Sequence, residues 1–217
     1  MFLIGLIDDE DSEIKKIRRT IKINAPSNVE FDFKSYNIPT IGADAVNIIS
    51  NEIIKDIEDQ SVMSLIIDYK IMVKTLKVQG TDILKKINDF VPKFPVIILT
   101  ERVEDSIKPE FVDADKVYKK RDFFKLEEEY SKEKVTHIFD SMKKYVNQKD
   151  QLIVNLEQMK EKLLSGDRSV IGDVLNIEVE LDKFIPVDET QLDRVYNPDK
   201  MRSIVDLIEK ADELIGK

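Results

Sequence analysis

Four short pieces of the chain end apolar runs with side chains that can hold a metal ion or a phosphoryl group. Asp8-Asp9-Glu10 follows the first run, Asp68 ends the second, Thr100 ends the third, and Lys120 closes the fourth. In open α/β sheets the ligand crevice lies outside the carboxyl ends of the strands. We therefore expect an acidic pair, a lone carboxylate, a hydroxyl and an ammonium to meet at one sheet edge, an arrangement that suits a metal-assisted phosphoryl acceptor.

Alternating strand and helix patterns would position these side chains. Nearly continuous apolar runs predict strands buried on both faces, whereas the alternation of apolar and polar residues at 29–36 predicts an edge strand. Apolar residues at helical spacing predict the helices between them. The predicted strands are 2–7, 29–36, 63–67, 95–99 and 116–119, and the predicted helices are 12–23, 43–59 and 82–90. This alternation is typical of an α/β protein with a doubly wound, five-stranded parallel sheet.

The pattern changes from Val135 onward. Apolar residues there recur every three or four positions as far as Leu163, which predicts a long helix at about 125–165 and the seam of a helical hairpin or coiled coil. Such a seam allows a homodimer through the long helix. One seam position, Lys149, is polar, and the wide apolar face favours packing against further helices. Further helices are predicted at about 170–184 and 199–215. We therefore divide the chain into an α/β domain, 1–125, and an all-α region, 126–217.

Composition narrows the classes of protein to which the chain can belong. Its 217 residues are 42% apolar and 35% charged, with only 6 Gly and 7 Pro, which indicates a folded, helix-rich protein. The absence of Cys excludes disulfides, thiolate metal sites and a Cys nucleophile. The net charge of −9 lies mostly in residues 126–217, which argues against a nucleic-acid-binding output. The opening apolar run is too short for a membrane span and lacks the basic start of a signal peptide, so we expect a cytoplasmic protein without membrane contact.

The four pieces, in this order, resemble the receiver domain of two-component response regulators over residues 1–125. Asp8-Asp9-Glu10 resembles the acidic run after the first strand of that family, and Leu65–Asp68 resembles the strand that delivers the phospho-accepting aspartate. Pro95–Thr100 is similar to the strand that ends in a hydroxyl, and Ala114–Lys120 to the run that ends in a lysine. The resemblance implies the receiver fold, with strand order 2-1-3-4-5.

The resemblance also implies a reaction and its partners. Asp68 would accept a phosphoryl group from a histidine kinase or phosphotransfer protein, and the modified state would act on a protein effector through the helical region. Asp8, Asp9, Asp68 and the backbone carbonyl of Lys70 would hold Mg²⁺, which prefers oxygen ligands. The protein would not be an enzyme beyond catalysing its own phosphorylation and dephosphorylation.

Thr100 and Lys120 would complete the shell around the phosphoryl oxygens, by a hydrogen bond and by an ion pair. Counting from Ala114-Asp115 selects Lys120, whereas a one-residue shift would select Lys119 on the other face of the strand.

Four departures from the family pattern support an alternative. Glu101 follows Thr100 where the family has a small residue, and Arg121 replaces the family's proline. The loop after Asp68 reaches Gly80 late, and the segment after Thr100 is short. The alternative is a pseudo-receiver, a phosphorylation-independent interaction module. A hydrolase that uses Asp68 as its nucleophile is a third class, but the sequence offers it no general acid or base.

Overall fold

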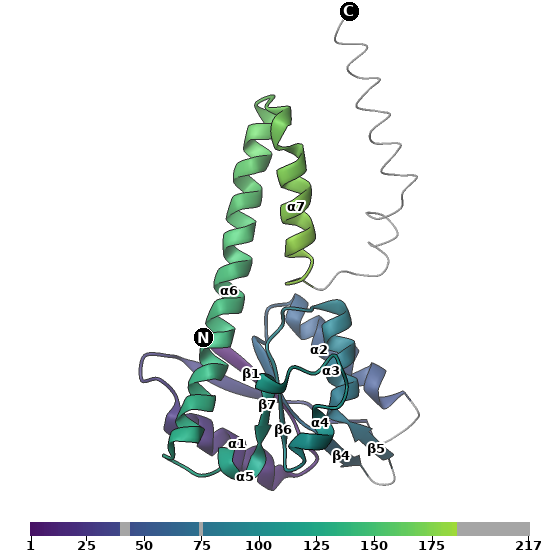
Figure 1. Ribbon diagram of the computed structural model, residues 1–217, viewed down its shortest axis with the longest axis vertical. Coiled ribbons are helices and arrows are strands. Elements are labelled where there is room, and N and C mark those ends of the chain that lie inside the picture. The colour runs from purple at the N-terminus through teal and green to yellow at the C-terminus, as the bar shows by residue number, and fades with distance from the viewer. Residues whose placement is uncertain (40–43, 74–75, 186–217) are drawn as a thin grey trace, which may run out of the picture. The chain divides into compact units, whose positions relative to one another are not determined.

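The centre of the protein is a parallel sheet, seen in a computed structural model that describes residues 1–39, 44–73 and 76–185 (Figure 1). The sheet has five strands in the order β2-β1-β3-β6-β7. These strands are β1 (Phe2–Ile7), β2 (Phe31–Ser35), β3 (Ser64–Asp68), β6 (Val96–Thr100) and β7 (Val117–Lys119). Counted within the sheet alone, the order is 2-1-3-4-5, with β2 at one edge. The predicted fold class, a receiver-like α/β sheet followed by helices, is confirmed.

Helices cover both faces of this sheet. The α-helices that the structure describes are α1 (Asp11–Asn24), α2 (Ala45–Glu58), α3 (Gly80–Phe90), α4 (Val103–Ser106), α5 (Lys120–Phe123), α6 (Glu129–Leu164) and α7 (Ile171–Leu181). On one face α1 and the first half of α6 bury residues such as Ile17 and Phe139 against the strands. On the other face α2 and α3 bury residues such as Ile53 and Ile83. Two apolar cores therefore fix the sheet from both sides.

The register of the parallel strands brings their carboxyl ends to one edge. Ile7 of β1 lies beside Ile67 of β3, and Asp68 lies beside Leu99 of β6. Thr100 in turn lies beside Lys119 of β7. The residues that follow these positions therefore share one edge of the sheet.

A two-stranded antiparallel hairpin lies between Asp68 and α3, where the sequence indicated only a long loop. Its strands are β4 (Lys70–Val73) and β5 (Leu76–Gln79). Ile71 and Val78 lie opposite each other and are buried in the core with α2 and α3, while their neighbours Met72 and Lys77 are exposed. This alternation is the strand pattern that the sequence analysis missed, because each strand has only four residues.

One continuous helix, α6, links the sheet to the rest of the helical region. Its 36 residues first pack on the sheet and then extend past it to pair with α7 in an antiparallel hairpin (Figure 1). A long helix was predicted at about 125–165 and a further helix at about 170–184, whereas the helix predicted at 199–215 lies outside the described residues. The described residues all lie in one compact unit. The functional division at residue 125 stays a prediction.

Within residues 1–39, 44–73 and 76–185, no helix is both long enough and apolar enough to span a bilayer.

Candidate functional site

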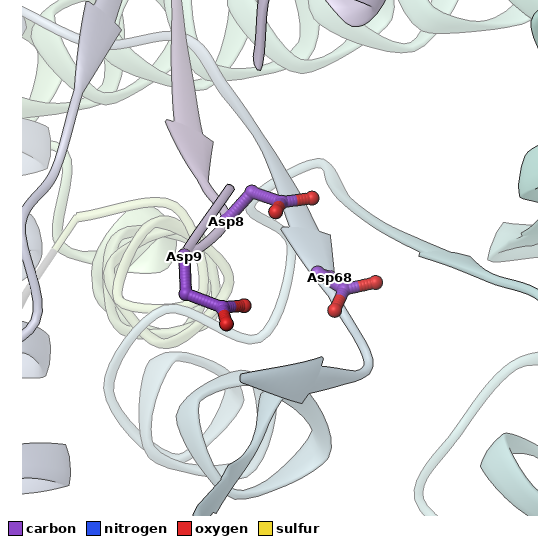
Figure 2. Close-up of side chains that lie close together, drawn as sticks. All are labelled: Asp8, Asp9 and Asp68. Carbon is purple, nitrogen blue, oxygen red and sulfur yellow. The ribbon is translucent and has the colours of Figure 1, made fainter. Parts of the chain in front are cut away.

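Three carboxylates converge at the carboxyl edge of the sheet. Asp8 and Asp9 follow β1, and Asp68 ends the adjacent strand β3, so the strand register places them together. Each offers a carboxylate oxygen, and these oxygens all lie within 4.8 Å of one another (Figure 2). Asp8 is only 8% exposed, whereas Asp9 is open to solvent. The cluster is therefore anchored in the core on one side and accessible from the other.

Lys120 supplies the cation of this cluster. Its Nζ donates hydrogen bonds to Oδ2 of Asp8 at 2.8 Å and to Oδ1 of Asp68 at 3.0 Å. It also lies 3.6 Å from Oε2 of Glu13 on α1. The neighbouring Lys119 is instead exposed and pairs with Asp122. Of the two lysines, Lys120 is therefore the one that the strand directs into the acidic cluster.

The pKa values of the carboxyl groups of Asp8 and Asp68 depend on two opposing causes. Burial raises them, and the ammonium of Lys120 lowers them. Burial raises the pKa of Asp68 to about 6, although the charge and hydrogen bond of Lys120 act to lower it. Burial likewise raises the pKa of Asp8, against the hydrogen bond that Lys120 donates. For Lys120, burial lowers the pKa, but the hydrogen bond to Asp8 and the charge of Asp68 outweigh it and hold the pKa above its usual value. The cluster carries more negative charge than Lys120 can offset.

Thr100 and Lys70 lie beside the cluster in different ways. Thr100 ends β6, one residue beyond the register partner of Asp68, and is 3% exposed. Its Oγ1 accepts a hydrogen bond from the backbone N–H of Arg102 at 2.9 Å, which leaves its own O–H as a donor. The backbone N–H of Lys70 donates to Oδ2 of Asp68 at 3.3 Å. The register thus brings Thr100 to the same edge, and the amide of Lys70 contacts the cluster directly.

The donor set of the cluster fits a hard divalent cation. Carboxylate oxygens are the ligands of Mg²⁺, Ca²⁺ and Mn²⁺, and Mg²⁺ in particular keeps several waters and needs few protein ligands. Asp9 provides the solvent-facing side through which a hydrated ion can enter. Asp8, Asp9 and Asp68 therefore form a candidate metal site.

The β4–β5 hairpin holds the main chain at Asp68. Gly80, at the end of the hairpin, donates its N–H to the carbonyl of Tyr69 at 2.7 Å. A Cβ at Gly80 would collide with the carbonyl oxygen of Asp68. Sequence reasoning located Gly80 but not this contact, and it also missed Glu13, whose position in the first turn of the helix after Asp8 was the available signal.

Comparison with known proteins finds similarity among solved structures only. No protein-family model matches the chain, and no curated protein sequence matches it. Among solved structures, the chain is similar to the response regulator RcsB of Salmonella typhimurium, whose structure was described for its conformational dynamism in DNA interaction. The identity is 14% and the TM-score 0.40, over 90% of this chain and 98% of that chain. The receiver-like fold of this protein rests on its own strand order and register.

Proposed function

We propose that this protein is a response-regulator-like signalling protein that accepts a phosphoryl group on Asp68 with Mg²⁺ bound beside it. The observation that carries the proposal is the ammonium of Lys120, which lies 3.0 Å from Asp68 and 2.8 Å from Asp8. An acceptor carboxylate with a fixed cation and two further carboxylates beside it has the parts that phosphoryl transfer to an aspartate requires.

Each residue has a definite role in the proposed reaction. A carboxylate oxygen of Asp68 forms a bond to the phosphorus of the donor, and the bond between phosphorus and the donor's leaving group breaks. Mg²⁺ held by Asp8, Asp9 and Asp68, with the carbonyl of Lys70, would offset the negative charge of the phosphoryl oxygens.

Two further side chains would bind the transferred group. The ammonium of Lys120 would pair with a phosphoryl oxygen after transfer, and the hydroxyl of Thr100 would donate a hydrogen bond to another. The protein would then be no enzyme beyond catalysing its own phosphorylation and dephosphorylation.

The proposed partners are proteins. The donor would be a phosphorylated histidine of a kinase or phosphotransfer protein in the cytoplasm. Output would pass through the helical region to a protein effector, because α5 begins at Lys120 and leads directly into α6. The acidic charge of residues 126–217 speaks against a nucleic-acid partner. The length of α6 makes a homodimer through this helix part of the same proposal.

Intact-mass spectrometry tests the acceptor directly. The protein is incubated with Mg²⁺ and acetyl phosphate, and the expected result is a mass gain of one phosphoryl group. Asp68→Asn, which keeps the shape of the side chain, should abolish the gain, as should chelation of Mg²⁺. Asp89→Asn on α3 is the matched control and should retain it. No gain in the unmodified protein, or a gain that persists in Asp68→Asn, would overturn the proposal.

A pseudo-receiver is the second candidate. Glu101 is exposed directly after Thr100, where its charge would repel an anionic donor, and the β4–β5 hairpin replaces the loop that follows the acceptor in receivers. Mg²⁺ titration followed by thermal melting separates the two candidates. Saturable stabilisation that is lost in Asp9→Ala would indicate an intact acidic pocket and favour the receiver, whereas no stabilisation by Mg²⁺, together with no phosphoryl gain from any donor, would favour the interaction module.

A further inference from the structure

A surface cavity outside the acidic cluster gathers basic side chains. Its volume is about 400 Å³, and it lies on the side of the domain where α1 and α5 meet (Figure 1). Arg19 and Lys16 of α1 line it, together with Arg121 of α5. The aromatic ring of Phe124 forms an apolar part of its wall. The cavity therefore combines positive charge with an apolar surface.

The two arginines of this cavity are available to a ligand. Arg19 and Arg121 are both exposed, and neither forms an ion pair with any acidic residue in the described part of the chain. Lys16 is different, since it pairs with Glu13 at 2.6 Å and its Nζ lies 5.6 Å from the centroid of the Phe124 ring. Arginine presents a planar fork of N–H donors that matches phosphate and carboxylate oxygens.

Two sequence departures from the receiver pattern also meet in this cavity. Glu101 directly follows Thr100, and Arg121 directly follows Lys120, and both line the cavity. Neither residue is assigned a role in the proposed reaction at Asp68, where the charge of Glu101 would only repel an anionic donor. A ligand site lined by Glu101 and Arg121 would explain why these two residue types differ from the receiver pattern.

We propose that this cavity binds a small organic anion. Its phosphate or carboxylate group would lie between Arg19 and Arg121, and its apolar part would lie against Phe124. Charge-assisted hydrogen bonds from the two arginines supply the recognition. The carboxylate of Glu101 opposes the anion and limits its affinity. This site is independent of phosphorylation at Asp68.

Calorimetric titration of the full chain with phenyl phosphate, benzoate and inorganic phosphate tests the proposal. Excess chelator is present throughout, so that no divalent ion occupies the acidic cluster. We expect saturable binding of phenyl phosphate or benzoate, weaker binding of inorganic phosphate because it has no apolar part, and weakening of all binding by salt. The stronger of the two aromatic ligands identifies phosphate or carboxylate as the preferred group.

Four variants locate the site. Arg121→Gln should weaken binding about fivefold or more, and Arg19→Gln should weaken it by a similar factor, because each removes one donor to the anion. Glu101→Gln should tighten binding by about twofold to fivefold, since it removes a repelling charge. The matched control is Lys55→Gln on α2, which removes one positive charge on the opposite face of the sheet and should change nothing.

Three results would contradict the proposal. No saturable binding of either aromatic anion would overturn the proposal, and so would binding that Arg121→Gln and Arg19→Gln leave unchanged while their thermal melts show folded protein. Equal weakening by Lys55→Gln would identify diffuse charge attraction and would also overturn it.

Discussion

At the scale of residues, Lys120 has a role both in folding and in the proposed chemistry. Its ammonium is the cation that both Asp8 and Asp68 contact, and burial raises the pKa of each of these carboxyl groups. An unpaired buried charge is costly, so substitution of Lys120 would disturb folding and phosphoryl binding together. Asp68→Asn is the cleaner test, because it removes the nucleophile while leaving Lys120 paired with Asp8.

The stability of the protein should also depend on pH through Asp56, a charged residue outside the acidic cluster. Asp56 on α2 accepts hydrogen bonds from Lys34 and, at 2.6 Å, from the hydroxyl of Tyr36, and its side chain is 16% exposed. Burial acts to raise the pKa of Asp56, but these two hydrogen bonds outweigh it and hold the pKa below the usual value. The ionised carboxylate therefore stabilises the folded state above about pH 4, and this contribution is lost as the pH falls through the lowered pKa.

We expect Asp56→Asn to lower the free energy of unfolding by about 1–3 kcal/mol at pH 7, because two hydrogen bonds to a charged acceptor are weakened. The difference from the unmodified protein should shrink at about pH 3, because the carboxyl group of the unfolded chain is then largely protonated and the stabilisation that comes from the lowered pKa is being lost. Urea unfolding at the two pH values measures this. Glu52→Gln is the control, since Glu52 lies 3.6 Å from Lys34 and is 52% exposed, so it should cost less than about 0.5 kcal/mol. An Asp56→Asn effect that does not depend on pH would contradict the assignment.

At the scale of elements, the sequence predicted the helices and strands that have long apolar patterns and missed the strands whose patterns are short. The sheet strands and the helices α1, α2 and α3 were predicted within a few residues of their observed bounds, because each presents a continuous apolar run or stripe. The hairpin β4–β5 was missed, since Ile71 and Val78 are its only buried side chains that the structure describes. The contact of Gly80 with the main chain of Asp68 depends on that hairpin, so the sequence did not predict this contact either.

Gly80 leads to an element-scale prediction. A Cβ at this position would meet the carbonyl oxygen of Asp68 and lie 2.8 Å from Cγ2 of Ile67, so Gly80→Ala must displace the hairpin or the end of β3. We expect a loss of about 1–3 kcal/mol in the free energy of unfolding, measured by chemical denaturation.

A matched glycine variant provides the control. Gly172 lies in α7 with no atom within 4 Å of an added Cβ, so Gly172→Ala should instead be neutral or stabilise by up to about 1 kcal/mol. Equal effects of the two substitutions would show that Gly80 is not constrained by Asp68.

At the scale of the whole molecule, α6 belongs to the sheet core as much as to the helical region. The predicted seam is buried at Val135, Ile138, Met142, Tyr145 and the polar position Lys149, but its positions from Leu152 onward are only partly buried. The sequence showed one unbroken stripe and could not show that its first half faces a sheet and its second half a single helix, because both partners require the same apolar spacing. The sheet edge that carries the acidic cluster and the helical hairpin are consequently parts of one compact unit.

Tyr145 marks the point where the two environments of α6 meet. Its ring lies 5.5 Å from that of Phe94, which precedes β6, and its hydroxyl donates to the carbonyl of Phe184 beyond α7 at 2.5 Å. The residue thus ties the end of the hairpin to the sheet core. A structural change at the sheet therefore has a direct route to α7, and the sheet and α6 should unfold together.

Two alanine substitutions in α6 test this cooperativity. Phe139 is 0% exposed and packs against Phe31 of β2 with ring centroids 5.1 Å apart, so Phe139→Ala should lower the free energy of unfolding by about 3–5 kcal/mol. Leu156→Ala, in the half-buried second part of the same helix, should cost about 1 kcal/mol. Urea unfolding is followed by far-ultraviolet circular dichroism and by tyrosine fluorescence, and the two signals should change in one coincident transition. If Phe139→Ala instead produced a separate early loss of helix while the sheet remained folded, α6 would be an appended element and not part of the core.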